Sequence, residues 1–315
     1  MHVASPLSHA GAPQVILEVC GAHSGIRVVI FSNNNPFQSA VSGTTRMLDA
    51  AVAAGVRQVV ITASIASLAP LGDLWKETTI SEKCESSRNK IDQDPAYTTL
   101  ISPVPPFATA YNLQTVEDAL QPGTSALVVY SVSKALADLA GRDFKRAHPD
   151  LDLTTIHPSY VYGPLGSGQV YNSPNAGTNR FVYGLIDGAP NRTVSGYDPA
   201  TRGPPLNIDV RDVARAHVLA LKVPPSDTLK RFILSSSKFT WKEAVEFLAQ
   251  ARPELKGRLP VITGKEPAVP PFATLDTSAT ETILGLKSYV KWQDTVLDTI
   301  DDLVRVEKEL SVAAQ

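Results

Sequence analysis

The stretch GTTRMLDAAVAAGVRQVVITAS, residues 43–64, decides the fold class of this chain. Residues 43–54 place apolar side chains at helical spacing, and Gly55 follows at the position where a helix commonly ends. Residues 56–64 then bring a run of β-branched side chains, which is typical of a strand buried on both faces of a parallel sheet. A helix followed directly by such a strand predicts an α/β unit.

The same two elements recur further along the chain. Residues 131–148, SVSKALADLAGRDFKRAH, form an Ala-rich helical pattern, and residues 151–164, LDLTTIHPSYVYGP, form a strand pattern that ends at a proline. Residues 70–129 between the two units are rich in Pro, Ser and Thr, and we interpret them as a surface excursion with one short helix at 112–121. Two such units predict a Rossmann-like, doubly wound parallel sheet.

The sequence pattern changes after Gly163: short helical patterns there are separated by loops. The later patterns include a strand at residues 231–236 and a helix at 241–251. Residues 296–310 predict an amphipathic helix whose apolar side consists of Val296, Ile300, Leu303, Val304 and Leu310. We predict that residues 1–163 form the Rossmann-like domain and that residues 164–315 form mainly a smaller α/β domain. Residues 207–221 are expected to return to the first domain.

Composition excludes several classes of protein. The chain has 315 residues, of which 43% are hydrophobic and 19% charged, so it can build a sizeable core and is not disordered. The net charge of −2 and the lack of a basic run argue against nucleic-acid binding. No apolar run of about 18 residues predicts a membrane span, and no signal-peptide pattern opens the chain, which predicts a cytoplasmic location. Cys20 and Cys84 are too few for a disulfide framework, and no Cys/His spacing predicts a metal site.

Tyr130 and Lys134 give the strongest chemical signal, because residues four apart on a helix project from the same face. We expect them at the opening of a helix. A nearby ammonium group favours the phenolate form of a tyrosine, which suits the phenol to general acid or base chemistry. The same spacing also fits an exposed helical pair. Ser64 ends the strand pattern at 56–64 and so lies at the sheet edge where open α/β folds build their sites, although a plain strand-end turn is the other interpretation.

Four blocks, in this order, resemble the extended short-chain dehydrogenases/reductases, especially the dihydroflavonol-reductase branch and its fungal ketoreductase relatives. The blocks are residues 43–68, YSVSKALAD at 130–138, HPSYVYGP at 157–164 and NIDVRDVARAHVLAL at 207–221. The resemblance implies that residues 1–163 bind NAD(P) and that the second domain binds substrate. It also implies that NADP is the cofactor, with NAD as the other option. The family often forms homodimers, so a homodimer is one option for this chain, whose oligomeric state the sequence leaves open.

The resemblance assigns roles to three side chains. Tyr130 is expected to protonate the carbonyl oxygen as hydride arrives from the nicotinamide. Lys134 is expected to hold the ribose and to favour the Tyr130 phenolate. Ser64 is expected to hydrogen-bond the same carbonyl oxygen. His157 and His217 are expected to be packed residues without a catalytic role.

The resemblance also assigns cofactor contacts to main-chain segments. Pro158, Ser159 and Val161 are expected to border the nicotinamide ring. The N-terminal His2–Pro6 segment resembles the end of the family's fourth strand. Its residues Val3, Ala4 and Ser5 are therefore expected beside the cofactor.

The chain departs from the family pattern near its N-terminus. The family fold begins with a strand, a Gly-x-x-Gly-x-x-Gly turn and a helix that receives the pyrophosphate. The glycines of Gly21–Gly25 have the wrong spacing, residues 7–35 match nothing expected, and the first three strands are not recognised. Two explanations stay open: an incomplete longer reductase with an unrelated insertion, or a variant in which residues 7–35 patch the sheet edge.

These observations leave three hypotheses. The first is an NAD(P)-dependent oxidoreductase, a carbonyl reductase or alcohol dehydrogenase, that acts on a small organic substrate. The second is a catalytically silent or unstable family member that does not bind dinucleotide. The third, ranked below the other two, is a nucleotide-sugar epimerase or dehydratase.

Overall fold

The structure is a computed structural model that describes residues 14–17, 36–81, 112, 114–166, 169, 173–175, 177–194 and 204–313. Several residues singled out in the sequence lie outside these ranges: Val3, Ala4, Ser5, Cys20, Cys84 and the glycines of Gly21–Gly25. In the described part of the chain, no helix has the length and apolar character needed to cross a membrane.

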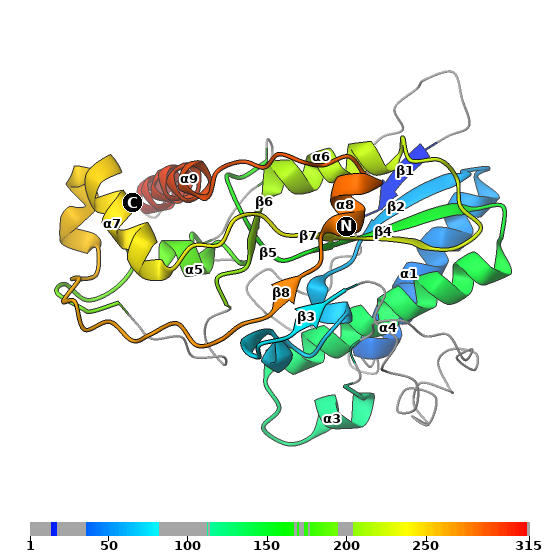
Figure 1. Ribbon diagram of the computed structural model, residues 1–315, viewed down its shortest axis with the longest axis horizontal. Coiled ribbons are helices and arrows are strands. Elements are labelled where there is room, and N and C mark those ends of the chain that lie inside the picture. The colour runs from blue at the N-terminus through cyan, green and yellow to red at the C-terminus, as the bar shows by residue number, and fades with distance from the viewer. Residues whose placement is uncertain are drawn as a thin grey trace.

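Within the described ranges, the main sheet has four parallel strands in the order β1 (Gln14–Leu17), β2 (Gln58–Thr62), β4 (Asp152–Pro158) and β7 (Lys230–Leu234). Helices cover both faces, with α1 and α4 on one side and α6 and α8 on the other (Figure 1). Every residue of β4 is buried, and this includes the polar residues Thr155 and His157, whose side chains contact each other at 2.8 Å. The predicted doubly wound α/β sheet is confirmed.

Helix α1 (Pro36–Ala53) and β2 form the α/β unit predicted from the opening stretch. The helix ends through two backbone bonds: Gly55 N–H donates to the Val52 carbonyl and Val56 N–H to the Ala51 carbonyl, both at 2.9 Å. Gly55 has φ +75°, the left-handed conformation that glycine adopts readily. The turn therefore sends the chain directly from the helix into the sheet.

Helix α4 (Ala126–Ala147) begins a turn earlier than the sequence pattern predicted. Tyr130 consequently lies in the second turn and not at the helix opening. The reason is packing, because Val128 and Val129 in the first turn contact the hydrophobic cluster around Phe37 of α1. Helices α1 and α4 lie against each other beneath the sheet (Figure 1).

The excursion between the two units contains the predicted short helix, now bounded as α3 (Val116–Leu120). Thr115 caps it, and Asp118 closes the reciprocal capping bond. Two short elements precede it, η2 (Leu71–Trp75) and β3 (Thr79–Ile80). Strand β3 pairs in parallel with β8 (Thr274–Leu275), so the excursion contacts a segment from far along the chain.

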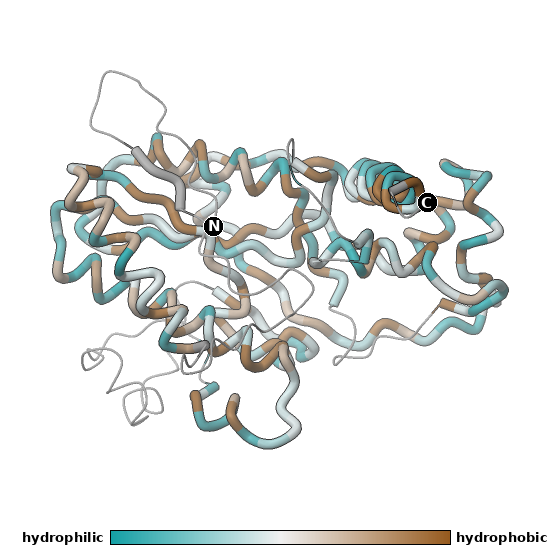
Figure 2. Tube along the Cα trace, turned by 180° about the vertical axis from the view of Figure 1, so that it is seen from behind, coloured by the Kyte–Doolittle hydropathy of each residue, from teal (hydrophilic) through white to brown (hydrophobic). Residues whose placement is uncertain are grey.

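A second hydrophobic core lies away from the main sheet. The elements around it are β5 (Tyr160–Tyr162), β6 (Asn207–Asp209), α5 (Arg180–Tyr183), α7 (Trp241–Ala251), η4 (Pro253–Arg258) and α9 (Trp292–Ala313). Phe239 packs edge-on to Trp241 at 5.5 Å between ring centroids and stacks on Trp292 at 5.0 Å. The tube in Figure 2 changes repeatedly between brown and teal along the helices, as expected for helices with one buried face.

Helix α9 buries most of the side predicted from its sequence. Val296, Ile300 and Leu303 are fully buried, whereas Leu310 is only half-buried. Val306 is buried in addition, because the helix lies against both α5 and α7 and so hides a wider face than a single stripe.

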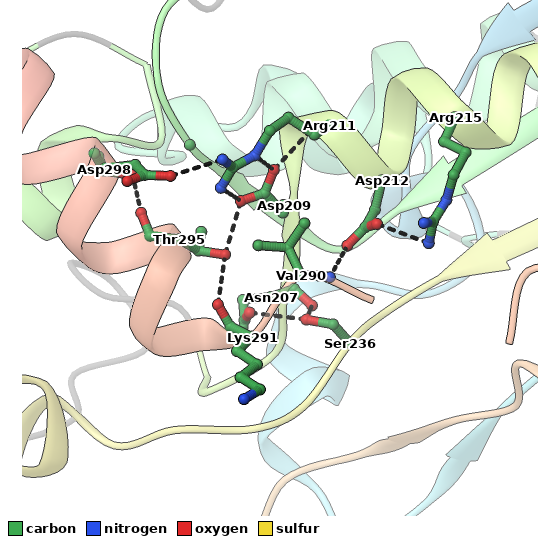
Figure 3. Close-up of polar contacts among 12 residues, drawn as sticks. Asn207, Asp209, Arg211, Asp212, Arg215, Ser236, Val290, Lys291, Thr295 and Asp298 are labelled. Carbon is green, nitrogen blue, oxygen red and sulfur yellow. Dashed lines mark hydrogen bonds and ion pairs between the residues drawn. The ribbon is translucent and has the colours of Figure 1, made fainter. Parts of the chain in front are cut away.

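Helix α6 (Val210–Ala220) is joined to α9 by a polar junction (Figure 3). The fully buried Asp209 carboxylate accepts hydrogen bonds from the Arg211 guanidinium and from the Thr295 hydroxyl, at 2.8 Å each. Burial alone raises the pKa of Asp209, but these bonds outweigh burial and hold the pKa below its usual value. Arg211 also pairs with Asp298 on α9 at 2.6 Å.

Candidate active site

Ser64 lies directly beyond the carboxyl end of β2, as the sequence predicted. It caps the short helix η1 (Ile65–Ser67): its Oγ accepts a hydrogen bond from the Ala66 N–H at 3.1 Å. The residue is buried, with 8% of its surface exposed. The cap fixes the oxygen of the hydroxyl and leaves its hydrogen for another acceptor.

Tyr130 and Lys134 project from one face of α4, a turn apart. Lys134 is 7% exposed, and its Nζ lies 5.8 Å from the centroid of the Tyr130 ring. Tyr130 itself is half-buried. Because α4 packs against η1, the helix that carries both residues borders the segment that Ser64 opens. The structure thus brings the predicted helix pair and the predicted strand-end serine to one region.

The strand end at 158–161 lies in the same neighbourhood. Pro158 closes β4, and Ser159 N–H donates to the Leu234 carbonyl at 2.9 Å. The Ser159 hydroxyl is buried and has no hydrogen-bond partner among the described residues. Burial raises the pKa of Tyr160, and the nearby Tyr130 raises it further, so these two phenols are close enough to interact. Val161 accepts a hydrogen bond from Thr178 through its carbonyl oxygen.

His157, on β4, is fully buried among polar groups. Its Nδ1 lies 3.2 Å from the Ser64 carbonyl oxygen and 3.1 Å from the Ser67 hydroxyl, and its Nε2 lies 2.8 Å from the Thr155 hydroxyl. Burial lowers the pKa of His157 to about 4, against the opposite effect of Asp138. The imidazole is therefore neutral near pH 7.

Asp138 is the carboxylate behind this histidine, and the sequence analysis missed it. It forms a buried ion pair of 2.7 Å with Arg231 of β7. Burial raises the pKa of Asp138, but Arg231, His157 and the Ser67 hydroxyl together hold the pKa below its usual value. Its spacing of four residues from Lys134 was a usable signal, because it places both on one helix face.

His217 is also buried, on α6. Its Nδ1 lies 2.8 Å from the Val213 carbonyl oxygen and its Nε2 lies 2.8 Å from the Thr62 hydroxyl. Since a carbonyl only accepts, Nδ1 carries the hydrogen and Nε2 accepts from Thr62. The side chain ties α6 to the end of β2, as expected for a packed residue.

Comparison with known proteins places this arrangement in a family. No family model matches the chain. An uncharacterised oxidoreductase of Saccharomyces cerevisiae is 30% identical over 286 residues, which are 86% of this chain and 70% of that protein. The chain belongs to the extended short-chain dehydrogenase/reductase family.

Two further comparisons agree with this membership of the extended reductase family. The NADPH-dependent methylglyoxal reductase GRE2 of Saccharomyces cerevisiae is 29% identical over 190 residues, which are 56% of this chain and 51% of that protein. The crystal structure of Gre2 from Candida albicans in complex with NADPH superposes with a TM-score of 0.69 at 26% identity, and the match covers 93% of this chain and 77% of that one. The Rossmann-like fold is shared with these family members.

The described residues fit one end of the dinucleotide that the family implies. The buried Ser159 hydroxyl has no hydrogen-bond partner in the described part of the chain, and the buried Lys134 ammonium group lies next to the half-buried Tyr130. These groups suit a polar ligand such as a nicotinamide riboside. A cavity lined by Lys134, Asp138 and Thr155 has room for about one water molecule and is too small for a cofactor.

In the described ranges, no comparable group of residues is placed to bind the pyrophosphate end of the dinucleotide. None of the glycines there forms a Gly-x-x-Gly-x-x-Gly turn between a strand of the main sheet and a helix.

Proposed function

We propose that the chain is an NADPH-dependent carbonyl reductase, which in reverse is an alcohol dehydrogenase, with Tyr130 as its general acid. The observation that carries the proposal is the buried Lys134, whose Nζ lies 5.8 Å from the Tyr130 ring centroid on the helix that borders Ser64. A phenol, an ammonium group and a serine hydroxyl at the carboxyl edge of a parallel sheet suit proton transfer to a carbonyl oxygen.

Each side chain has a separate task in this proposal. NADPH, when bound, supplies the hydride. Tyr130 donates its phenolic proton to the carbonyl oxygen as negative charge develops there, and the Lys134 ammonium group stabilises the phenolate that remains. Ser64 donates its hydroxyl hydrogen to the same oxygen, because its own oxygen is held by the Ala66 N–H at 3.1 Å.

The cofactor assignment rests on two supports. The yeast relative is named NADPH-dependent and the Candida albicans relative was solved with NADPH. In this chain we place the nicotinamide beside Pro158, Ser159 and Val161, where the Ser159 hydroxyl is available for a hydrogen bond. Val3, Ala4 and Ser5 are assigned to the cofactor by the family resemblance alone.

The test begins with titrations of the full chain with NADPH and with NADH, followed by tryptophan fluorescence. Turnover is then measured by NADPH absorbance, with methylglyoxal as the first carbonyl substrate and other small aldehydes and ketones after it. In Tyr130→Phe we expect turnover to fall by at least about a thousandfold, because the proton donor is lost, with an unchanged NADPH affinity and melting temperature. Near-normal turnover in this variant contradicts the proposed role of Tyr130.

A second candidate is a family member that does not bind dinucleotide. The observation in its favour is the lack of a glycine-rich phosphate turn among the described residues. A cooperative melting transition without NADPH or NADH binding up to millimolar concentration selects this candidate, since that limit corresponds to only about −4 kcal/mol.

A further inference from the structure

Four elements bring polar side chains to one buried point behind the candidate active site. Thr155 and His157 are two residues apart on β4 and so point to the same face of the sheet. Asp138 of α4, Arg231 of β7 and Ser67 of η1 meet them there. All five side chains are almost fully hidden from solvent, so their hydrogen bonds act in a medium of low polarity.

The contacts of His157 determine which ring nitrogen carries its hydrogen. Nδ1 lies 3.2 Å from the Ser64 carbonyl oxygen, which can only accept, so Nδ1 is the donor. Nε2 therefore accepts a hydrogen bond, and the Thr155 hydroxyl at 2.8 Å supplies it. The Thr155 hydroxyl can donate, so its contact is compatible with the tautomer in which His157 holds Ser64.

Ser67 gives the Ser64 carbonyl a second and a third contact. Its hydroxyl lies 2.8 Å from that oxygen and its backbone N–H donates to it at 3.0 Å. The same hydroxyl lies 3.3 Å from Asp138 Oδ2. A hydroxyl has one hydrogen for these two acceptors, so when the Ser67 hydroxyl donates to Asp138, the Nδ1–H of His157 gives the Ser64 carbonyl a second hydrogen bond beside that of the Ser67 N–H.

We propose that His157 is a positioning residue for Ser64: its Nδ1–H holds the Ser64 carbonyl oxygen, and the hydroxyls of Ser67 and Thr155, at 3.1 and 2.8 Å from its two ring nitrogens, hold the imidazole in place. The Ser64 hydroxyl then stays fixed relative to Tyr130 and Lys134 on the neighbouring helix. The proposal rests on the proposed function, in which Ser64 contacts the carbonyl substrate. It also reaches beyond that function, because it concerns a residue that does not touch substrate.

A matched pair of variants separates the hydrogen bond from simple packing. His157→Asn keeps a donor nitrogen at the same number of bonds from the backbone as Nδ1, whereas His157→Leu has a similar volume and no donor. We expect the asparagine variant to retain the Ser64 contact and the leucine variant to lose it. A role in packing alone predicts that leucine is tolerated as well as asparagine.

The first readout needs no enzymatic activity. The Ala66 N–H donates to Ser64 Oγ and the Ser67 N–H donates to the Ser64 carbonyl, so both amides report the position of Ser64. In His157→Leu we expect these amides to exchange with deuterium at least about tenfold faster, measured by NMR with α9 amides as the internal reference. In His157→Asn we expect exchange close to the wild-type rate. Equal protection in wild type and His157→Leu overturns the proposal.

The second readout is a double-mutant cycle with Ser64→Ala. If His157 acts through Ser64, His157→Leu lowers kcat by about tenfold in the wild-type background and has no further effect once Ser64 is alanine. The dissociation constant of NADPH is expected to stay constant throughout. If His157→Leu lowers kcat by the same factor with serine and with alanine at position 64, the proposal is overturned.

The two readouts also separate this proposal from the proposed function. Absence of NADPH-dependent turnover in the wild type refutes the proposed function, and the exchange rates still decide whether His157 holds Ser64. Turnover with unchanged exchange in His157→Leu refutes the positioning role alone.

Discussion

Asp138 lies one turn beyond Lys134 on α4 and forms a 2.7 Å ion pair with Arg231, a residue of the edge strand β7 of the described sheet. Both side chains are buried, with Asp138 fully inaccessible. The pair therefore neutralises the buried Asp138 carboxylate and joins α4, the helix that carries Tyr130, to strand β7 at the edge of the described sheet.

The ion pair predicts a stability pattern that a surface pair does not show. Asp138→Asn leaves the Arg231 charge buried without its counter-ion, and we expect the free energy of unfolding to fall by about 3–5 kcal/mol. The double variant Asp138→Leu with Arg231→Met removes both charges and is expected to recover most of this loss. Urea unfolding followed by circular dichroism measures both. A double variant less stable than Asp138→Asn contradicts this account.

His157 predicts how stability depends on pH. Its pKa is about 4 in the folded protein and near 6.5 when unfolded, so the unfolded chain binds more protons between these values. Stability from this residue is complete above pH 6.5 and falls as the pH drops to 4, by about 3 kcal/mol in total. Asp138 faces the imidazole and favours protonation, whereas Arg231 and Lys134 oppose it.

Unfolding measured in urea at a series of pH values checks this prediction. The His157→Asn variant lacks the titrating group, so its stability should change less between pH 6.5 and 4 than that of the wild type. Asp138 contributes to the pH dependence at a lower pH than His157. Its pKa is depressed in the folded protein, so its stabilisation is lost only as the pH falls through that depressed pKa. Parallel pH curves for wild type and His157→Asn rule out His157 as the source.

The junction between α6 and α9 offers a comparison of a buried with an exposed carboxylate (Figure 3). Asp209 is fully buried and is held by Arg211 and Thr295, so Asp209→Asn should lower the free energy of unfolding by about 2 kcal/mol. Asp298 is 40% exposed and pairs with the same arginine, and Asp298→Asn should cost about 0.5 kcal/mol. Thermal and urea unfolding of the two variants test the difference. Similar losses of unfolding free energy in the two variants indicate that the burial of a carboxylate does not decide how much it stabilises the junction.

Gly163, which follows the strand end beside the candidate active site, is expected to tolerate no side chain. Its φ is +142°, and an added Cβ would lie 2.5 Å from Val210 Cγ1 at the start of α6. We expect Gly163→Ala to lower the free energy of unfolding by at least about 2 kcal/mol. Gly55→Ala is the matched control, because Gly55 has a positive φ but nothing within 4 Å, and it should cost about 1 kcal/mol. Equal losses of stability in Gly163→Ala and Gly55→Ala, measured by melting, show that backbone strain alone accounts for the effect of both substitutions.

The sequence predicted the elements whose signals are local. The helix and strand of residues 43–64, the Thr115-capped helix and the face of α9 follow from side-chain periodicity and end signals, which depend on neighbours a few residues away. The start of α4 was placed too late because its first turn is stabilised by contact with α1. The division into two domains near residue 163 and the homodimer stay predictions.

The residues of the candidate site also fall into two groups: those that local sequence signals predicted and those that only the fold brings together. Tyr130 and Lys134 were recognisable because one helical turn separates them, and Ser64 because it ends a β-branched run. Asp138 could have been found from its spacing to Lys134, but its pairing with His157 and Arg231 could not, because only the packing of α4 on strands β4 and β7 brings these three residues together. The sequence by itself determined the family and named the candidate residues whose signals are local. Only the tertiary structure decided which distant charges share a buried site, since burial makes their pairing obligatory.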